Sequence, residues 1–261
     1  MTWKERKSMK RIDNDPASHL KALIYGKPGV GKTNLAVSAP KPLILLSEAQ
    51  GLVHARGAAE RLGKPMPPTL LIESVDDLRA SLKALMGNKE KPLKIGGIEL
   101  EWPETIALDS LTDYGHLVKQ EIREQSPPKP GRDGLPVDAQ RYWGVMGDRM
   151  TNLILAFRNL PFHVVFLALL DDREEGEEDA KVRVVGPDMP MRKLAGVVAA
   201  AVNVIGIATR GTKENEPVYS VVTNGPDYMT LKPYRPLRNK EIPDMTYWID
   251  RLAGKCEERA I

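Results

Sequence analysis

Cysteine is nearly absent from this chain of 261 residues, because Cys256 is the only one. A lone cysteine excludes an intrachain disulfide and a metal cage built from several thiolates. The sequence also lacks any run of about 18 apolar residues, which a membrane-spanning helix needs. Its basic N-terminal segment, residues 1–11, has no apolar stretch like that of a signal peptide. We therefore expect a soluble cytoplasmic protein without a membrane partner.

A large charge imbalance is missing as well. Lys and Arg total 38 against 35 for Asp and Glu, which leaves a net charge of +3. So small an excess does not by itself indicate a nucleic-acid partner, and any basic surface has to be local. The four histidines share no ligand spacing, so they predict no metal site.

The order of apolar segments predicts an α/β fold. Residues 1–18 are expected to be a flexible basic arm and residues 19–261 a single domain, since no linker or repeat interrupts them. Strands alternate with helices up to residue 170, which favours a mostly parallel central sheet flanked by helices, and the strand-rich remainder predicts C-terminal antiparallel strands. The predicted strands are 20–25, 43–46, 70–72, 105–108, 163–170, 182–185, 202–208, 218–223 and 229–232. Helices are predicted at 34–38, after Ser74, at 146–157 and after Asp244, with a turn or hairpin at 88–102.

A glycine-rich motif follows the first predicted strand. Gly26-Lys27-Pro28-Gly29-Val30-Gly31-Lys32-Thr33 matches the whole phosphate-loop pattern G-x-x-x-x-G-K-[ST]. In such a loop, backbone N–H groups surround phosphate oxygens and the following helix adds its positive N-terminal dipole. Lys32 is expected to contact the β- and γ-phosphates, Thr33 to ligate Mg²⁺, and Asn34 to lie beside the nucleotide. The motif predicts a P-loop NTPase that binds ATP and Mg²⁺.

Two carboxylates complete the predicted site. Asp109 ends the apolar strand 105–108, where a P-loop fold places the carboxylate that orients Mg²⁺. Ser110 follows it and cannot serve as the general base of ATP hydrolysis. Glu48 is the candidate base, because it follows the strand 43–46 and should emerge at the same edge of the sheet. A surface glutamate in a turn is the alternative interpretation, and Asp171 and Glu104 are the next candidates for the base.

The order of these motifs resembles that of the RecA-like ATPases, and further that of phage-encoded nucleotide-binding proteins with a RecA-like core. Several of those are regarded as single-strand annealing recombination proteins. The likeness covers residues 18–252. The segments that carry it are Leu23-Ile24-Tyr25-Gly26, Ser47-Glu48-Ala49-Gln50-Gly51, Ile106-Ala107-Leu108-Asp109-Ser110-Leu111-Thr112, Tyr142-Trp143-Gly144, Leu160-Pro161-Phe162-His163-Val164-Val165-Phe166, 187–204 and 232–235.

The resemblance implies an ATPase of DNA recombination. Such a protein would form a homo-oligomeric ring or filament in the cytoplasm of a bacterial host, bind single-stranded DNA and promote annealing or strand pairing. A single-strand-binding protein or another replication or recombination protein would be its partner.

Two features depart from this resemblance. Leu169 and Leu170 stand where such proteins usually carry a polar residue that senses the γ-phosphate. The acidic run 171–179 occupies the loop that would contact DNA, and because carboxylates repel phosphates, a solvated hairpin tip is the plainer interpretation. The run favours a second function, that of a nucleotide-dependent switch or assembly ATPase with a protein partner in replication or packaging.

A different segment suits DNA better. Residues 123–141 include Lys129, Arg132 and Arg141 and lead into Tyr142 and Trp143. Cations beside aromatic rings favour single-stranded DNA, through phosphate attraction and base stacking. A flexible surface loop with core aromatics at its exit is the alternative, and both remain open here.

Lys232 and Arg235 are candidates for residues that reach the γ-phosphate of a neighbouring subunit, a role that the resemblance suggests. Their Lys-x-x-Arg spacing departs by one residue from the Lys-x-Arg fingers of related ATPases. Arg235 is therefore the weaker assignment, and Arg238 is an alternative to it. A basic surface turn fixed by Pro233 and Pro236 would explain the same residues.

Overall fold

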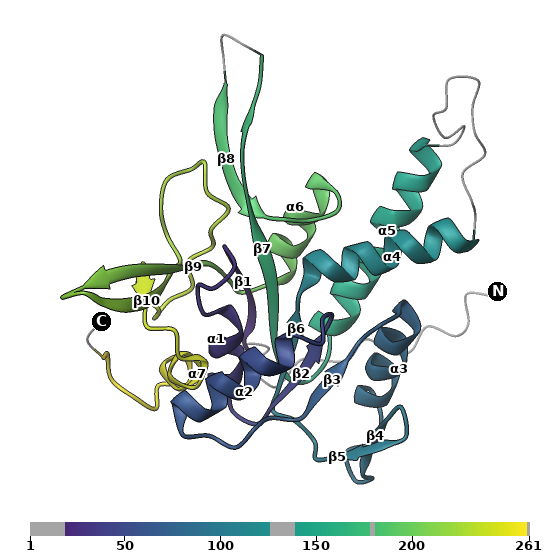
Figure 1. Cartoon of the computed structure of the whole chain (residues 1–261), viewed down its shortest axis with the longest axis horizontal. Coiled ribbons are helices and arrows are strands. Elements are labelled where there is room, and N and C mark those ends of the chain that lie inside the picture. Colours follow the sequence, from purple (N-terminus) through teal and green to yellow (C-terminus); the bar gives the residue numbers. More distant parts are fainter. Residues whose placement is uncertain (1–18, 126–138, 178–180, 260–261) are drawn as a thin grey trace, which may run out of the picture.

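A computed structural model describes residues 19–125, 139–177 and 181–259 of the chain (Figure 1). The predicted arm 1–18 and residues 126–138 of the segment 123–141 therefore lie outside the described residues. The strands are β1 (Lys21–Gly26), β2 (Pro42–Leu46), β3 (Thr69–Leu71), β4 (Leu93–Ile95), β5 (Ile98–Leu100), β6 (Thr105–Asp109), β7 (His163–Glu175), β8 (Val182–Pro187), β9 (Val204–Lys213), β10 (Glu216–Val222) and β11 (Lys240–Glu241). The helices are α1 (Lys32–Ser38), α2 (Gly51–Leu62), α3 (Val75–Leu85), α4 (Leu111–Gln125), α5 (Ala139–Arg158), α6 (Arg192–Ala201) and α7 (Met245–Leu252).

The central sheet has the order β11-β10-β9-β1-β7-β6-β2-β3, and β8 pairs with β7. Each neighbouring pair in the stretch β9-β1-β7-β6-β2-β3 is parallel. The strands β8, β10 and β11 pair antiparallel with their neighbours. The predicted α/β class, with a mostly parallel sheet and antiparallel strands toward the C-terminus, is confirmed. One strand, β7, separates β1 from β6, so the phosphate loop and Asp109 end two strands that do not touch.

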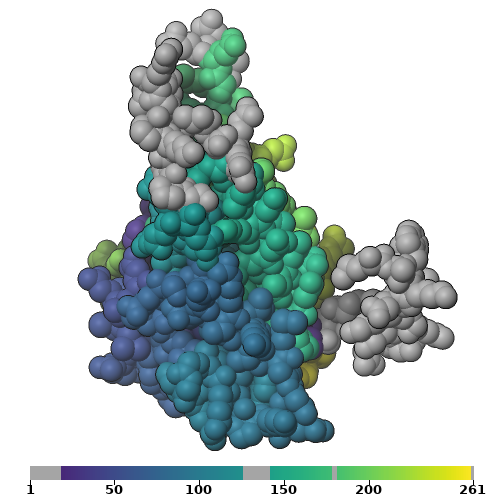
Figure 2. Space-filling model, turned by 90° about the vertical axis from the view of Figure 1, so that its right-hand side faces the viewer, coloured from purple at the N-terminus to yellow at the C-terminus, as the bar shows by residue number. Residues whose placement is uncertain are grey.

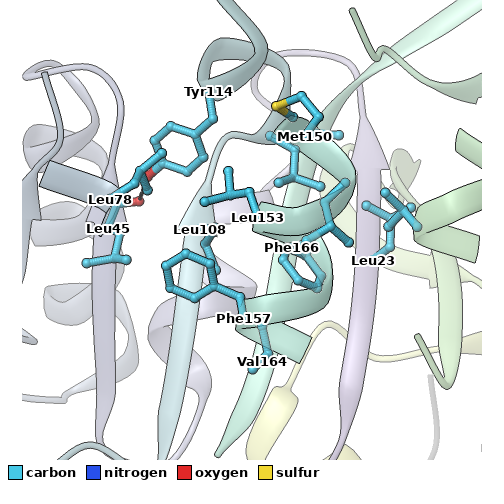
Figure 3. Close-up of a cluster of buried hydrophobic side chains, with 14 of the residues drawn as sticks. Leu23, Leu45, Leu78, Leu108, Tyr114, Met150, Leu153, Phe157, Val164 and Phe166 are labelled. Carbon is cyan, nitrogen blue, oxygen red and sulfur yellow. Dashed lines mark hydrogen bonds between the residues drawn. The ribbon is translucent and has the colours of Figure 1, made fainter. Parts of the chain in front are cut away.

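Helices cover both faces of the sheet because its strands are apolar on both sides. In β1, Leu23 and Tyr25 belong to one buried cluster, whereas Ala22 and Ile24 belong to the other. The first cluster packs beneath α3, α4, α5 and α6, and the second beneath α1, α2 and α7. Figure 3 shows the first cluster, in which the Tyr114 hydroxyl donates to the Leu45 carbonyl over 2.7 Å. Burying one such large apolar side chain stabilises a fold by about 1.5–3 kcal/mol, so both layers contribute.

The small hairpin of β4 and β5 lies below α3, at the end of the molecule opposite the tips of α4 and α5 (Figure 1). Figure 2 views the molecule from the right-hand side of Figure 1, with α3 and the hairpin in blue and α4 in teal above them. The hairpin that residues 88–102 predict is thus confirmed, as is the Ser74 cap of α3, whose hydroxyl accepts from the Asp77 N–H over 3.2 Å. None of the helices in the three described segments is long and apolar enough to cross a membrane.

Two predicted elements differ from the structure. The strand 163–170 continues to Glu175, because its polar end pairs with β8 instead of entering the core. The two strands form a hairpin that projects from the sheet (Figure 1). The predicted strand 229–232 is wrong: only Met229 and Lys232 of this segment make isolated bridges, to Val185 and Ile205, whereas the strand predicted at 218–223 is β10, which pairs with β9 and β11.

Candidate active site

The phosphate loop joins β1 to α1. Gly29 and Gly31 have φ angles of 77° and 88°, a left-handed conformation that glycine adopts without strain. Gly26 is closed in by β9, because a Cβ there would lie 2.7 Å from the Ala208 carbonyl oxygen. Each of these glycines is therefore required by the backbone path or by its neighbours. Between them Lys27 and Pro28 are exposed and Val30 is half-buried.

Lys32 begins α1 and is buried against the loop. Its ammonium donates to the carbonyls of Gly26 over 2.9 Å and of Lys27 over 3.0 Å. Burial lowers the pKa of Lys32, and the nearby carboxylates of Asp109 and Asp113 oppose that shift. The ammonium thus lies inside the loop, where it can exchange these carbonyls for phosphate oxygens.

Thr33, in the first turn of α1, and Asp109, at the end of β6, come together although β7 separates β1 from β6. The Thr33 hydroxyl donates to Asp109 Oδ2 over 2.8 Å. Burial raises the pKa of Asp109, while the Thr33 hydrogen bond and the charge of Lys32 lower it. A hydroxyl beside a buried carboxylate fits Mg²⁺, which takes oxygen ligands and completes its shell with phosphates and water. These two residues would hold the ion.

Glu48 lies at the same edge of the sheet, just after β2. It is exposed and lines a pocket of about 130 Å³ that also contains Thr33 and Asp109. The complete lining is Thr33, Leu46, Ser47, Glu48, Gln50, Gly51, His54, Asp109 and Asp113. A carboxylate in this pocket can accept a proton from water next to a bound phosphate.

The two substitutes for Glu48 differ in where they lie. Glu104 precedes β6, at the opposite edge of the sheet, and pairs with Lys41 over 2.8 Å. Asp171 pairs with Arg173 on its own strand. Glu104 as the next candidate is therefore a wrong prediction, because the parallel strands carry its carboxylate away from the P-loop.

Asp113 is a site residue that the sequence motifs did not reveal. Its carboxylate accepts from the hydroxyls of Ser47 over 2.9 Å and Ser110 over 2.5 Å. The signal that could have identified it is the sequence Ser110-x-x-Asp113, which resembles a helix capping box at the start of α4.

The other predicted site residues are less closely tied to the pocket. Asn34 accepts from the Arg61 guanidinium over 2.8 Å, so its side chain faces α2. Lys129 and Arg132 lie outside the described residues, and Arg141 falls in the first turn of α5, where only the backbone is described. Trp143 is 40% exposed, and Tyr142 packs edge-on against it.

Lys232 lies far from its own phosphate loop. Its ammonium donates to the carbonyls of Ala199 and Val202, over 3.0 and 2.6 Å, at the C-terminus of α6. That helix end is next to the start of β1, since the Asn203 N–H donates to the Lys21 carbonyl. Arg235 is exposed, and Arg238 is held by Glu241 and Glu258.

In the middle of β7, beside the end of β1, Leu169 and Leu170 stand where a γ-phosphate sensor is expected. Leu169 pairs with Gly26 and its N–H donates to the Thr112 hydroxyl over 3.0 Å. Thr112 in turn donates to the Asp188 carbonyl over 2.8 Å. A buried threonine thus links the middle of β7, α4 and the segment after β8.

A complete phosphate loop, a carboxylate on a strand two positions away in the sheet, and helices on both faces define a P-loop NTPase domain of RecA-like architecture. Residues 18–231 match the family described as AAA domain, AAA_24, and the chain belongs to that family. The family implies nucleotide binding. A search of curated protein sequences finds no significant match.

Solved structures of similar architecture include an ATPase, a flagellar accessory protein and a KaiC-like protein. One is an ATPase from the type III secretion system of pathogenic bacteria, with 13% identity and a TM-score of 0.41 over 73% of this chain and 51% of that one. This chain thus spans about half of that protein's length. Two others are the flagellar accessory protein FlaH from Methanocaldococcus jannaschii (10% identity, TM-score 0.37, 85% of this chain and 83% of that one) and a KaiC-like protein from Pyrococcus horikoshii (12%, 0.38, 85% and 82%).

Proposed function

We propose that this protein hydrolyses ATP with Mg²⁺ at the pocket between the phosphate loop, β2 and β6. The observation that carries the proposal is the 2.8 Å contact of Thr33 with Asp109 in a pocket that Glu48 also lines. Lys32 would leave the carbonyls of Gly26 and Lys27 to bind phosphate oxygens, and the loop N–H groups would surround them. Bound Mg²⁺ would offset the negative charge of the triphosphate.

In this proposal Glu48 is the general base. A water oxygen bonds to the γ-phosphorus as the bond to the ADP oxygen breaks, and Glu48 accepts the proton that the water loses. Glu48→Gln keeps the shape of the side chain but cannot accept this proton. Phosphate release should fall on the order of 10²-fold or more while ATP binding persists. Wild-type turnover in Glu48→Gln would assign the base to another residue.

We further propose that the ATPase acts in DNA recombination, by binding single-stranded DNA and promoting annealing or strand pairing. The cations of residues 123–141 and the resemblance to phage recombination proteins support it. The acidic side chains of the β7–β8 hairpin oppose DNA binding less than the sequence suggests, because cations pair with them. Asp171 pairs with Arg173, Asp172 with Arg183, and Glu174 with Lys181. A nucleotide-dependent switch or assembly ATPase with a protein partner is the second candidate, and it is favoured if DNA does not bind.

A homo-oligomer would complete the site through a cation from the neighbouring subunit. The hydrogen bonds of Lys232 to α6 favour the exposed Arg235 for this role, which reverses the order that the spacing suggests. Mixing Arg235→Ala with Lys32→Ala subunits should then restore part of the activity, because some interfaces combine an intact loop with an intact cation. Absence of recovery in co-assembled mixtures, with turnover independent of protein concentration, would reject the shared site.

A further inference from the structure

The loop that carries Glu48 is fastened to the end of β6. The Ser47 N–H donates to the Asp109 carbonyl over 2.8 Å, and the Ser110 N–H donates to the Ser47 hydroxyl over 3.2 Å. The Ser47 hydroxyl is also 3.1 Å from the Asp109 carbonyl oxygen and 2.9 Å from Asp113 Oδ2. A hydroxyl has one proton, so it donates fully to only one of these two acceptors at a time. The charged carboxylate is the stronger of the two.

Asp113 therefore has a place in this junction that differs from helix capping. It lies in the first turn of α4, and its N–H is 3.4 Å from the Ser110 hydroxyl oxygen, as in a capping box. Its second hydroxyl partner, Ser47, is 66 residues away in the sequence and next to Glu48. A cap alone needs no such partner.

The chain contains a capping box without this additional contact. On α3, Asp77 accepts from the Ser74 N–H over 2.9 Å and from the Ser74 hydroxyl over 2.8 Å. Both groups of that box are exposed, and neither lines the pocket. In both places a serine hydroxyl donates to an aspartate three residues later. On α4, however, the Ser110 N–H donates to the Ser47 hydroxyl instead of to the aspartate, and only this junction reaches the loop of the candidate base.

We propose that Asp113 is a positioning residue that holds the Glu48 loop against the β6–α4 junction through the Ser47 hydroxyl. This rests on the proposed ATP hydrolysis, since its kinetic effect acts through Glu48. Loss of the contact leaves the phosphate loop and Lys32 in place, so it reduces the rate of the chemical step more than nucleotide binding. The loop backbone of residues 47–51 becomes more open to solvent.

The experiment compares Asp113→Ala, Ser47→Ala, their double variant and the control Asp77→Ala. Hydrogen exchange of the nucleotide-free protein should rise at residues 47–51 in the first three variants and stay at the wild-type level in Asp77→Ala. For ATP hydrolysis, kcat should fall on the order of 10-fold in Asp113→Ala and Ser47→Ala, with KM changed less than about threefold. The kcat of the double variant should fall by less than the product of the two single effects, because both substitutions remove the contact between Ser47 and Asp113.

Wild-type exchange and kcat in Ser47→Ala would overturn the proposal, since Asp113 would then act through its charge or its cap alone. Equal effects in Asp77→Ala would overturn it as well, because any lost cap would suffice. If Asp113→Ala does not fold, Ser47→Ala alone carries the test, because it removes the contact and leaves the Asp113 charge in place. If the wild type does not hydrolyse ATP, the proposed function fails, and hydrogen exchange alone decides the positioning role.

Discussion

Gly29 and Gly31 both adopt left-handed φ angles, but their surroundings differ. A Cβ on Gly31 would lie 3.2 Å from Tyr219 Cδ1, whereas nothing lies within 4 Å of one on Gly29. Gly29→Ala should cost about 1–2 kcal/mol of unfolding free energy from backbone strain alone. Gly31→Ala should cost more, since the tyrosine ring has to move. Chemical denaturation of both variants measures the difference.

Tyr219→Ala in the Gly31→Ala background provides the control. Without the ring, Gly31→Ala should cost only the backbone strain. The unfolding free energy that Gly31→Ala removes should therefore be smaller in the Tyr219→Ala protein than in the wild type. Equal losses in the two glycine variants, with no recovery, would contradict a close contact between β10 and the phosphate loop.

The residues of the site were predictable to different degrees. The phosphate loop is local in the sequence, so eight consecutive residues were enough to identify it. Asp109 and Glu48 were predicted because parallel strands end at one edge of a sheet. Asp113 was not, because its contact with Ser47 joins two segments that only the fold brings together. The fallback Glu104 could have been excluded from the sequence, because it precedes the predicted strand 105–108 and therefore lies at the edge opposite the phosphate loop.

At the scale of elements, the amino-terminal edge of the sheet is held by a neutral histidine. His163 begins β7, and its Nδ1 accepts from the Leu20 N–H over 2.9 Å. Burial lowers the pKa of His163 from 6.5 to about 4, with further contributions from His19 and Lys21. The folded state thus favours the neutral ring. The contribution of the neutral His163 ring to the unfolding free energy is complete above the unfolded pKa of 6.5, and it is lost as the pH falls toward about 4.

We therefore expect the unfolding free energy to decrease between pH 6.5 and about 4 more steeply in the wild type than in His163→Asn. The asparagine oxygen can accept the Leu20 N–H and does not titrate. Denaturant unfolding at several pH values measures both slopes, and the carboxylates that titrate in this range affect both proteins alike. Parallel pH profiles would show that His163 does not contribute.

The elements that the sequence revealed are those with a strong apolar pattern. The interior strands β1, β2, β6 and β7 are continuous apolar runs, because helices cover them on both sides. The helix α2 gave no such signal, since its buried positions are the small residues Ala55, Ala58 and Ala59. The segment 229–232 was misassigned because a short apolar run does not identify its partner strand.

At the scale of the whole molecule, the proposed DNA-binding function predicts which residues contact a single strand. Replacing Lys129, Arg132 and Arg141 by alanine should weaken single-strand binding and reduce the salt slope by up to about 2, because fewer counterions are released. Replacing Lys83, Lys91 and Lys94, which are exposed on α3 and around the β4–β5 hairpin, removes the same charge elsewhere. Fluorescence anisotropy with a labelled strand at several salt concentrations compares the two.

An equal loss in both triple variants would indicate only a general charge effect. An unchanged salt slope in the variant of Lys129, Arg132 and Arg141 would reject residues 123–141 as the DNA contact. It would favour residues 4–11 of the basic arm instead. If the wild type does not bind DNA even at low salt, the protein-partner function is the one supported.

The central claim is that the loop from Gly26 to Thr33 binds ATP with Mg²⁺, and titration calorimetry with a slowly hydrolysed ATP analogue tests it most directly. Lys32→Ala should abolish measurable binding, because the ammonium inside the loop makes a charge-assisted contact with phosphate. Lys41→Ala removes a lysine that pairs with Glu104 at the opposite edge of the sheet, and should bind as the wild type does. Undiminished affinity in a folded Lys32→Ala protein would contradict the account.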